Sequence, residues 1–137
     1  MAGIVRFSVS VEDELLKRFD DYCNKEHLAT RSEAVRQLIH DRLTTKVWDN
    51  DRREVAATLT LVYDHHRADL GKKLGKLQHD HNDLIVATTH VHLTHDICME
   101  VIILRGQAGR LRQIADQLKG LKGVFKGELV TASTALH

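Results

Sequence analysis

The sequence predicts an α+β protein in two parts: a strand-helix-helix module comes first and a βαββαβ domain follows it. Two patterns predict this order. Residues 4–10 alternate apolar and polar side chains ahead of two segments with helical spacing, and four strand patterns with two helix patterns follow from residue 55. The 137 residues have room for two small domains. We expect the first at 1–48, a linker at 49–54 and the second at 55–137.

The strict alternation in residues 4–10 predicts one strand. Its apolar face holds Val5, Phe7 and Val9, and its polar face holds Arg6, Ser8 and Ser10. A single strand leaves its backbone donors and acceptors unpaired, and a module of about 50 residues buries too little apolar surface to fold alone. Two copies that pair their strands antiparallel would solve both problems. The resulting two-stranded ribbon fits the major groove of DNA.

Two capping pairs predict where the helices of this module begin, Ser10 with Asp13 and Thr30 with Glu33. After each pair, apolar residues recur at helical spacing. They are Leu15, Leu16, Phe19, Tyr22 and Cys23 in the first helix and Ala34, Val35, Leu38, Ile39 and Leu43 in the second. The position of Cys23 on this stripe indicates a core residue.

Charge by itself does not favour DNA binding. Residues 1–50 hold eight basic and nine acidic side chains, and the whole chain has a net charge of +1. The plain alternative to a DNA-reading ribbon is an amphipathic edge strand whose polar side chains face water. We favour the ribbon because the strand-helix-helix order and both capping pairs coincide.

Residues 5–43, in which Arg31-Ser32-Glu33-Ala34 opens the second helix, resemble the ribbon-helix-helix family of dimeric repressors. The resemblance implies that the outward strand side chains read base edges and that the start of the second helix binds a phosphate. The residues implied are Arg6, Ser8 and Ser10 for the bases, and Arg31 and Ser32 for the phosphate.

Residues 47–54 mix Trp48 with a run of charges and have no apolar period, which indicates that the linker lies within this stretch. The patterns beyond it predict βαββαβ, a ferredoxin-like antiparallel sheet with both helices on one face. They are a strand with Ala57, Leu59, Leu61 and Tyr63, a helix with Leu70, Leu74 and Leu77, strands at 84–93 and 97–104, a helix with Leu111, Ile114, Ala115 and Leu118 that ends at Gly120 or Gly123, and a strand at 124–131.

Seven of the ten histidines fall in 31 consecutive positions, 65–95, and this density indicates metal binding. His90 and His92 lie two apart on a strand, so they share a face with α-carbons roughly 6.5–7 Å apart. After a polar turn, the next strand brings Cys98 within reach of the same face. One hairpin would thus supply two imidazoles and a thiolate to a single ion.

His79 lies two positions beyond Leu77, about 200° around the helix, and therefore points away from the core of its own domain. We expect it to be a fourth ligand offered to a neighbouring chain. His81 continues the apolar stripe and is structural or part of an auxiliary site. Three nitrogens and a thiolate suit zinc if tetrahedral and nickel or copper if planar, and the spacing leaves this choice open.

The segments Gln78-His79, His90-Val91-His92 and residues 95–100 resemble the metal-binding signature of the nickel-responsive regulator (NikR) family, so the similarity spans nearly the whole chain. The resemblance implies an ACT-type domain and a homotetramer with one planar Ni(II) site per subunit. The ligands implied are His90, His92 and Cys98 of one subunit and His79 of another, with Tyr63 and Glu100 orienting them.

The chain departs from the family pattern at two places. The family holds a cation between its domains with two acidic residues; Glu33 matches the first, but Gln37 replaces the second. The family's basic pair for DNA backbone contacts is half present, as Arg67 followed by Ala68.

The other histidines receive no firm role. We expect surface or core positions for His27, His40 and His137. His65, His66, His81 and His95 stay undecided, with secondary metal contacts as one option.

These inferences predict a metal-responsive repressor that binds double-stranded operator DNA, and not an enzyme. A zinc metallohydrolase is a rival, but four protein ligands would leave no open position for water. A ribbon-helix-helix repressor with a small-molecule effector or another metal is a second rival. The chain has two cysteines 75 positions apart and shows no signal segment, which favours a reducing cytosol. It has no long apolar run, so we expect no membrane insertion.

Overall fold

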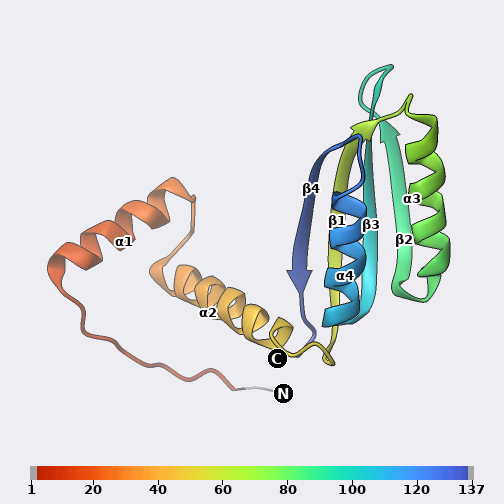
Figure 1. The fold of residues 1–137 in the computed structure, drawn as a ribbon. Helices are drawn as coiled ribbons and strands as arrows, with labels where there is room; N and C mark the ends of the chain where they lie inside the picture. Colours follow the sequence, from red (N-terminus) through yellow and green to blue (C-terminus); the bar gives the residue numbers. More distant parts are fainter. Residues whose placement is uncertain (1–2, 136–137) are drawn as a thin grey trace. The chain divides into compact units, whose positions relative to one another are not determined.

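A computed structural model describes residues 3–135 of the chain (Figure 1). These residues form two compact units that divide between Leu43 and Thr44. The helices are α1 (Asp13–Lys25), α2 (Arg31–Trp48), α3 (Ala68–Asp80) and α4 (Ala108–Lys119), and a short 3₁₀ turn, η1 (Asn82–Leu84), follows α3. The strands are β1 (Glu54–Asp64), β2 (Ile85–His92), β3 (Ile97–Gln107) and β4 (Val124–Ala132). His137 lies outside the described residues.

The helices of the N-terminal unit begin close to the expected positions, but only one expected cap forms. The Oγ1 of Thr30 accepts a hydrogen bond from the Glu33 amide at 3.0 Å, as expected for the start of α2. The expected cap by Ser10 is wrong, because Glu12 precedes α1 and the first helical hydrogen bond runs from the Leu16 amide to the Glu12 carbonyl. Ser10 is two residues too early to reach the free amides of this turn.

The segment expected to be a strand, residues 4–10, is not paired as a strand in the single chain. Its apolar side chains are left in water: Val5 is 86% exposed, and Phe7 and Val9 are each 69% exposed. The physical reason is that strand pairing needs a neighbouring backbone, and no described segment of this chain supplies one.

The helices of this unit also lack a core of their own. Among described residues 3–43, only Cys23 and Ala34 are buried. The expected apolar stripe is otherwise half exposed at several positions, namely Leu15, Leu38, Ile39 and Leu43. One copy of this unit therefore buries too little apolar surface to account for its own stability.

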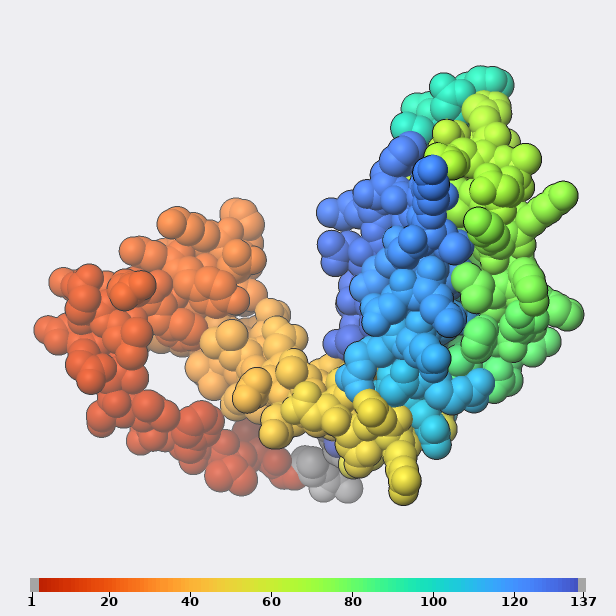
Figure 2. Space-filling model, viewed as in Figure 1, coloured from red at the N-terminus to blue at the C-terminus, as the bar shows by residue number. Residues whose placement is uncertain are grey.

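The C-terminal unit has the expected βαββαβ order, with an antiparallel sheet of strand order β2-β3-β1-β4. Both helices lie on one face of the sheet (Figure 1), and α4 covers the middle of the face seen in the space-filling view (Figure 2). Alternate residues of β1 point into the core, among them Leu59 and Leu61, which are completely buried. Ferredoxin-like topology is confirmed.

Trp48, which we placed at the end of the first domain, packs in the core of the C-terminal unit and is 4% exposed. Its Nε1 donates to the Ala132 carbonyl at 3.0 Å, and the Nη1 of Arg112 donates to the Trp48 carbonyl at 2.6 Å. An isolated aromatic residue among charges gives no periodic signal, and its partners lie 84 and 64 positions away. This attachment could not be inferred from local sequence.

We expect Trp48→Ala to lower the free energy of unfolding of the C-terminal unit by about 3–5 kcal/mol, because it removes a large buried ring and its hydrogen bond. Urea denaturation followed by circular dichroism measures the change. Lys46→Ala is the matched control on the same helix turn, since the Lys46 side chain is 62% exposed. An equal effect of the two substitutions would contradict the anchoring role of Trp48.

Candidate metal centre

The pairing of β2 with β3 brings the hairpin donors to one face of the sheet. His92 pairs directly with Cys98, and His90 pairs with Glu100. On the other side of β3, Tyr63 of β1 pairs with Cys98. Directly paired residues on antiparallel strands project to the same side, and the buried positions of β3 show that this is the side covered by the helices.

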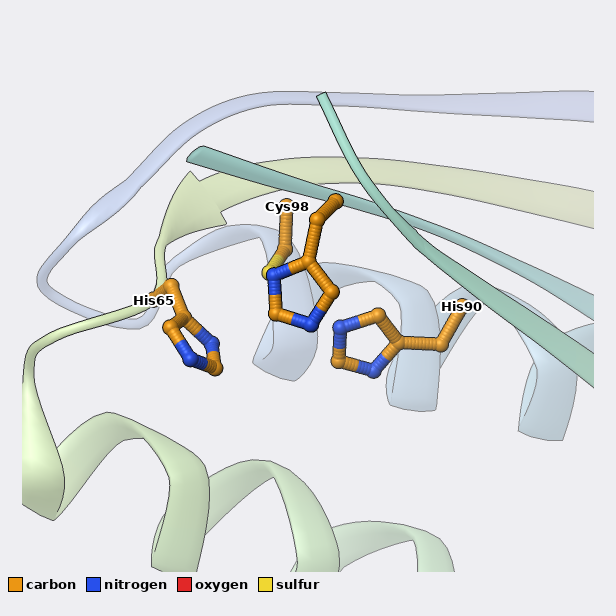
Figure 3. Close-up of side chains that lie close together, drawn as sticks. His65, His90 and Cys98 are labelled. Carbon is orange, nitrogen blue, oxygen red and sulfur yellow. The ribbon is translucent and has the colours of Figure 1, made fainter. Parts of the chain in front are cut away.

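Four side chains converge at this end of the sheet: His65, His90, His92 and Cys98 have potential ligand atoms within 4.8 Å of one another. Cys98 Sγ lies 3.4 Å from Nδ1 of His92. Figure 3 shows His65, His90 and Cys98 directed towards a common space from three different segments. The expected convergence of two imidazoles and one thiol from one hairpin is present.

His65, left undecided by the sequence, joins this group from the turn that follows β1. Its ring meets that of His92 edge-on, with centroids 4.5 Å apart. The register explains the position, because Tyr63 pairs with Cys98 and His65 follows two residues later. The sequence could indicate this only if β1 were known to lie beside β3.

His79 is exposed near the end of α3 and belongs to neither group of metal-ligating side chains among the described residues. His81 is half-buried, and its Nδ1 lies 2.9 Å from the Leu77 carbonyl, which favours the structural interpretation. His27 and His40 are exposed and also lie outside both described groups.

Behind the donors lies the carboxylate of Glu100, the one charged side chain that is buried among the described residues. It accepts hydrogen bonds from Tyr63 Oη at 3.4 Å and from Gln78 Nε2 at 2.6 Å, and Nδ1 of His90 is 3.7 Å away. Gln78 was not expected here. Its spacing from Leu70 and Leu74, eight and four residues, places it on the inward face of α3 and was the available signal.

Burial and charge set the protonation of the metal-free site. Burial raises the pKa of the Cys98 thiol, and the negative charge of Glu100 raises it further. The pKa of Tyr63 is raised by burial and then by the same carboxylate. Partial desolvation lowers the pKa of His65, and neighbouring imidazoles add to the effect. At neutral pH these shifts favour a protonated Cys98 thiol and a neutral His65 imidazole, and a metal ion must displace the thiol proton.

The donor set fits a transition-metal ion. A thiolate with imidazoles suits zinc, nickel and copper, whereas calcium and magnesium prefer oxygen ligands. Glu100 holds the residues around the donors, as the partners of metal ligands usually do. The site is therefore a candidate metal centre with a supporting layer already in place.

A second group lies beside the first. Its members are His66, His95 and Asp96, all exposed, whose ligand atoms also lie within 4.8 Å of one another. His66 Nε2 lies 2.9 Å from Asp96 Oδ1.

The residues expected to contact DNA are exposed in the N-terminal unit. Arg6, Ser8 and Ser10 are all exposed on the unpaired segment, as is Ser32 at the start of α2. Arg31 makes two 2.8 Å hydrogen bonds to the Asp20 carboxylate, so part of its charge is already neutralised.

Glu33, the candidate interdomain cation ligand, accepts a hydrogen bond from Arg36 on its own helix at 3.1 Å. A cation bound by this carboxylate would compete with that arginine.

Comparisons with known proteins agree with both halves of this description. A family model described as the NikR C-terminal nickel-binding domain matches residues 56–132, and a model of ribbon-helix-helix proteins of the copG family matches residues 5–46. Such a pair of domains defines a metal-binding transcription regulator and not an enzyme.

Relatives match over almost the whole chain. A putative nickel-responsive regulator of Nitratidesulfovibrio vulgaris (strain DP4) is 45% identical, covering 98% of this chain and 96% of that protein. One from Thermococcus onnurineus (strain NA1) is 47% identical, covering 96% and 95%. The chain belongs to the NikR family of nickel-responsive regulators. The resemblance inferred from sequence is confirmed, and the metallohydrolase alternative is excluded.

Among solved structures, an uncharacterised protein from Thermotoga maritima has a TM-score of 0.53 at 15% identity, covering 58% of this chain and 98% of that one. This likeness concerns the fold alone. Among the described residues, no helix has the length and apolar character needed to span a bilayer.

We expect Glu100→Gln to lower the pKa of the Cys98 thiol in the metal-free protein, because it removes the charge that opposes thiolate formation. The pKa should stay above its ordinary value, since burial is the larger cause. The pH dependence of thiolate ultraviolet absorbance in a Cys23→Ser background measures the shift. Glu128→Gln, an exposed carboxylate on β4, is the control. A midpoint that moves equally in both variants would contradict this electrostatic coupling.

Proposed function

We propose that the chain is a repressor whose affinity for operator DNA is raised by bound nickel. Its DNA-reading element is a two-stranded ribbon formed by residues 4–10 of two copies. The observation that carries this part is the exposure of Val5, Phe7 and Val9 together with the unpaired backbone of their segment. Pairing with a second copy would cover the apolar face and present the polar face to the major groove.

In this ribbon, Arg6, Ser8 and Ser10 are the side chains proposed to read base edges. Arg31 and Ser32, at the start of α2, are proposed to contact the DNA backbone, where free amides favour a phosphate. Arg31 already donates hydrogen bonds to the Asp20 carboxylate, so a DNA phosphate would have to share the arginine with Asp20. This sharing limits the contribution of Arg31 to nonspecific DNA affinity.

For the effector we propose one Ni(II) per subunit, held by His90, His92 and Cys98 together with His79 of a second subunit. The convergence of the three hairpin donors supports the first part. The exposure of His79, away from both groups in its own chain, supports the second. Glu100 and Tyr63 would orient the ligands through the contacts they make around His90.

His65 is the alternative fourth ligand, because it is the donor that the same chain places beside the other three. A site completed by His65 would lie within one subunit, whereas a site completed by His79 would connect two. The two arrangements therefore differ in what metal binding does to the assembly.

We propose a homotetramer in which ribbon dimers are joined through the C-terminal sheets. The sheet face opposite the helices carries exposed apolar side chains that a second copy would cover: Val91 on β2, Ile103 on β3 and Val130 on β4. Separately from this sheet contact, a metal ion held by the hairpin of one subunit and His79 of another could set the spacing of two ribbons, and so favour the arrangement that binds the operator. A reducing cytosol would keep the Cys98 thiol free to bind metal.

We expect nickel at one equivalent per subunit to strengthen operator binding, because metal must act on DNA through a difference in affinity between two arrangements. Titration of labelled operator with protein, in chelator and in nickel at one fixed salt concentration, measures the effect. Equal affinity under both conditions would contradict the nickel-sensing proposal and favour a different effector.

The Arg6→Ala variant serves as the control in that titration. Loss of a base-edge arginine contact should reduce discrimination between operator and unrelated DNA by about 1–3 kcal/mol, while leaving nickel binding unchanged. An unchanged operator preference would mean that the ribbon is not the reading element.

We expect a mixture of His79→Ala and Cys98→Ser proteins to recover the absorption of planar thiolate-bound nickel, although neither variant shows it alone. In a hybrid oligomer, an intact His79 can meet an intact Cys98 on another chain. Absorption spectra after subunit exchange, with hybrids verified by native mass spectrometry, measure the recovery.

A mixture of His65→Ala and Cys98→Ser proteins is the matched comparison. If His65 completes the site within one chain, His79→Ala alone keeps the spectrum and His65→Ala loses it. If verified hybrids of the His79→Ala and Cys98→Ser proteins do not recover the thiolate-nickel absorption, the site shared between subunits is ruled out.

A further inference from the structure

An ion pair between Asp20 and Arg31 joins the two helices of the N-terminal unit. Asp20 lies in α1 and Arg31 is the first residue of α2, and residues 26–30 connect the two helices (Figure 1). Nε of Arg31 donates to Oδ1 of Asp20 and Nη2 donates to Oδ2, both at 2.8 Å. Two parallel hydrogen bonds of this kind fix the orientation of the guanidinium as well as its position.

The pair is charged, and a ligand can still reach it from solvent. The first acidic residue of α2, Glu33, accepts a hydrogen bond from Arg36 at 3.1 Å, whereas Asp20 binds Arg31 from the other helix. The hydrogen bond from Arg31 lowers the pKa of the Asp20 carboxyl, so this group is ionised at neutral pH. The side chain of Arg31 is 61% exposed, which leaves it accessible to a ligand.

The ion pair uses only one edge of the guanidinium. An arginine side chain has five N–H donors, and Asp20 takes one from Nε and one from Nη2. The hydrogens of Nη1 and the second hydrogen of Nη2 form another edge, which points away from the carboxylate. A phosphate can bind this edge through two hydrogen bonds while Asp20 stays in place.

The start of α2 supplies further donors beside this edge. Oγ1 of Thr30 accepts from the Glu33 amide at 3.0 Å, and the Thr30 carbonyl accepts from the Ala34 amide at 3.1 Å. The amides of Arg31 and Ser32 precede these bonds, so the helical hydrogen-bond pattern provides no acceptor for them. One turn therefore carries both the free edge of the arginine and the two amides.

We propose that Asp20 is a positioning residue for Arg31 and increases the preference of the protein for its operator over unrelated DNA. The inference rests on the proposed contact between the start of α2 and the DNA backbone. A phosphate that lies opposite the free edge meets a guanidinium that is already oriented, so little side-chain entropy is lost. A phosphate in another position can be reached only if Arg31 leaves Asp20, and the charge of Asp20 opposes that contact.

The two kinds of DNA differ in how they place this phosphate. On the operator, base contacts fix the register of the protein, so the phosphate occupies the same position in every complex. On unrelated DNA the register varies, and many complexes place the phosphate away from the free edge. Asp20 therefore weakens binding to unrelated DNA more than binding to the operator.

The test is binding of full-length, nickel-loaded protein to two labelled duplexes over a range of salt concentrations. One duplex is a random-sequence pool, and the other is the duplex that the unmodified protein selects from this pool. Asp20→Asn should raise the affinity for the pool about two- to fivefold and steepen its logarithmic salt dependence by up to about 0.9 per arginine released. The affinity for the selected duplex should rise less, so that discrimination falls.

Asp21→Asn is the matched control, because Asp21 is an exposed neighbour in α1 and the substitution changes the net charge of the chain equally. Its effects on pool affinity and salt dependence should be smaller than those of Asp20→Asn. In an Arg31→Ala background, Asp20→Asn should act no more strongly than Asp21→Asn. Thermal unfolding followed by circular dichroism verifies that each variant is folded, and Asp20→Ser gives the same comparison if Asp20→Asn is unstable.

The outcomes separate this inference from the proposed function. If Arg31→Ala weakens pool binding but Asp20→Asn and Asp21→Asn behave alike, the role of Asp20 is overturned and the phosphate contact stands. If Arg31→Ala changes neither affinity nor salt dependence, the phosphate contact is overturned and the inference with it. Lower affinity of Asp20→Asn for both duplexes at unchanged salt dependence would mean that the pair only braces the helices. An equal gain on both duplexes would overturn the effect on operator preference.

Discussion

The antiparallel pairing of β2 with β3 controls the geometry on which the metal centre depends. Cross-strand partners share a face, so this register places His92 against Cys98 and His90 against Glu100. A shift by one residue would send the imidazoles to the opposite face of the sheet from the thiol. The long pairing of β3 with β1, from Glu54 to Asp64, holds the register from the other side.

The buried carboxylate of Glu100 imposes a compromise on the same site. It holds Tyr63 and Gln78 by hydrogen bonds and lies close to His90, so it fixes the surroundings of the donors. Its charge also raises the pKa of the Cys98 thiol, which opposes thiolate formation in the absence of metal. A bound dication would reverse that balance, because the same negative charge then stabilises the ion. The arrangement favours a Cys98 side chain that is a protonated thiol when the site is empty and a thiolate when a metal ion is bound.

The N-terminal unit is incomplete in a different way. Its first segment has no strand partner among the described residues of the chain, and its helices leave half of their apolar stripe in water. A second copy would remove both deficits, because pairing of the two strand segments would also bury the apolar side chains of both copies. The C-terminal unit, in contrast, closes its own core and even includes Trp48 from the end of α2.

The sequence by itself determined the order of elements, the shared face of His90 and His92 and the family, because periodicity and short spacings are local properties. It also indicated Cys98, which follows His92 by only a short turn. Tertiary structure alone decided the positions of Trp48 and His65 and the pairing of Gln78 with Glu100, and it brought His66 to Asp96. These contacts join segments from different strands and helices, so they depend on strand order and packing, which no local pattern encodes. The start of α1 was also decided by the structure, because Glu12 and not Ser10 occupies the N-cap position, and no side chain caps the helix there.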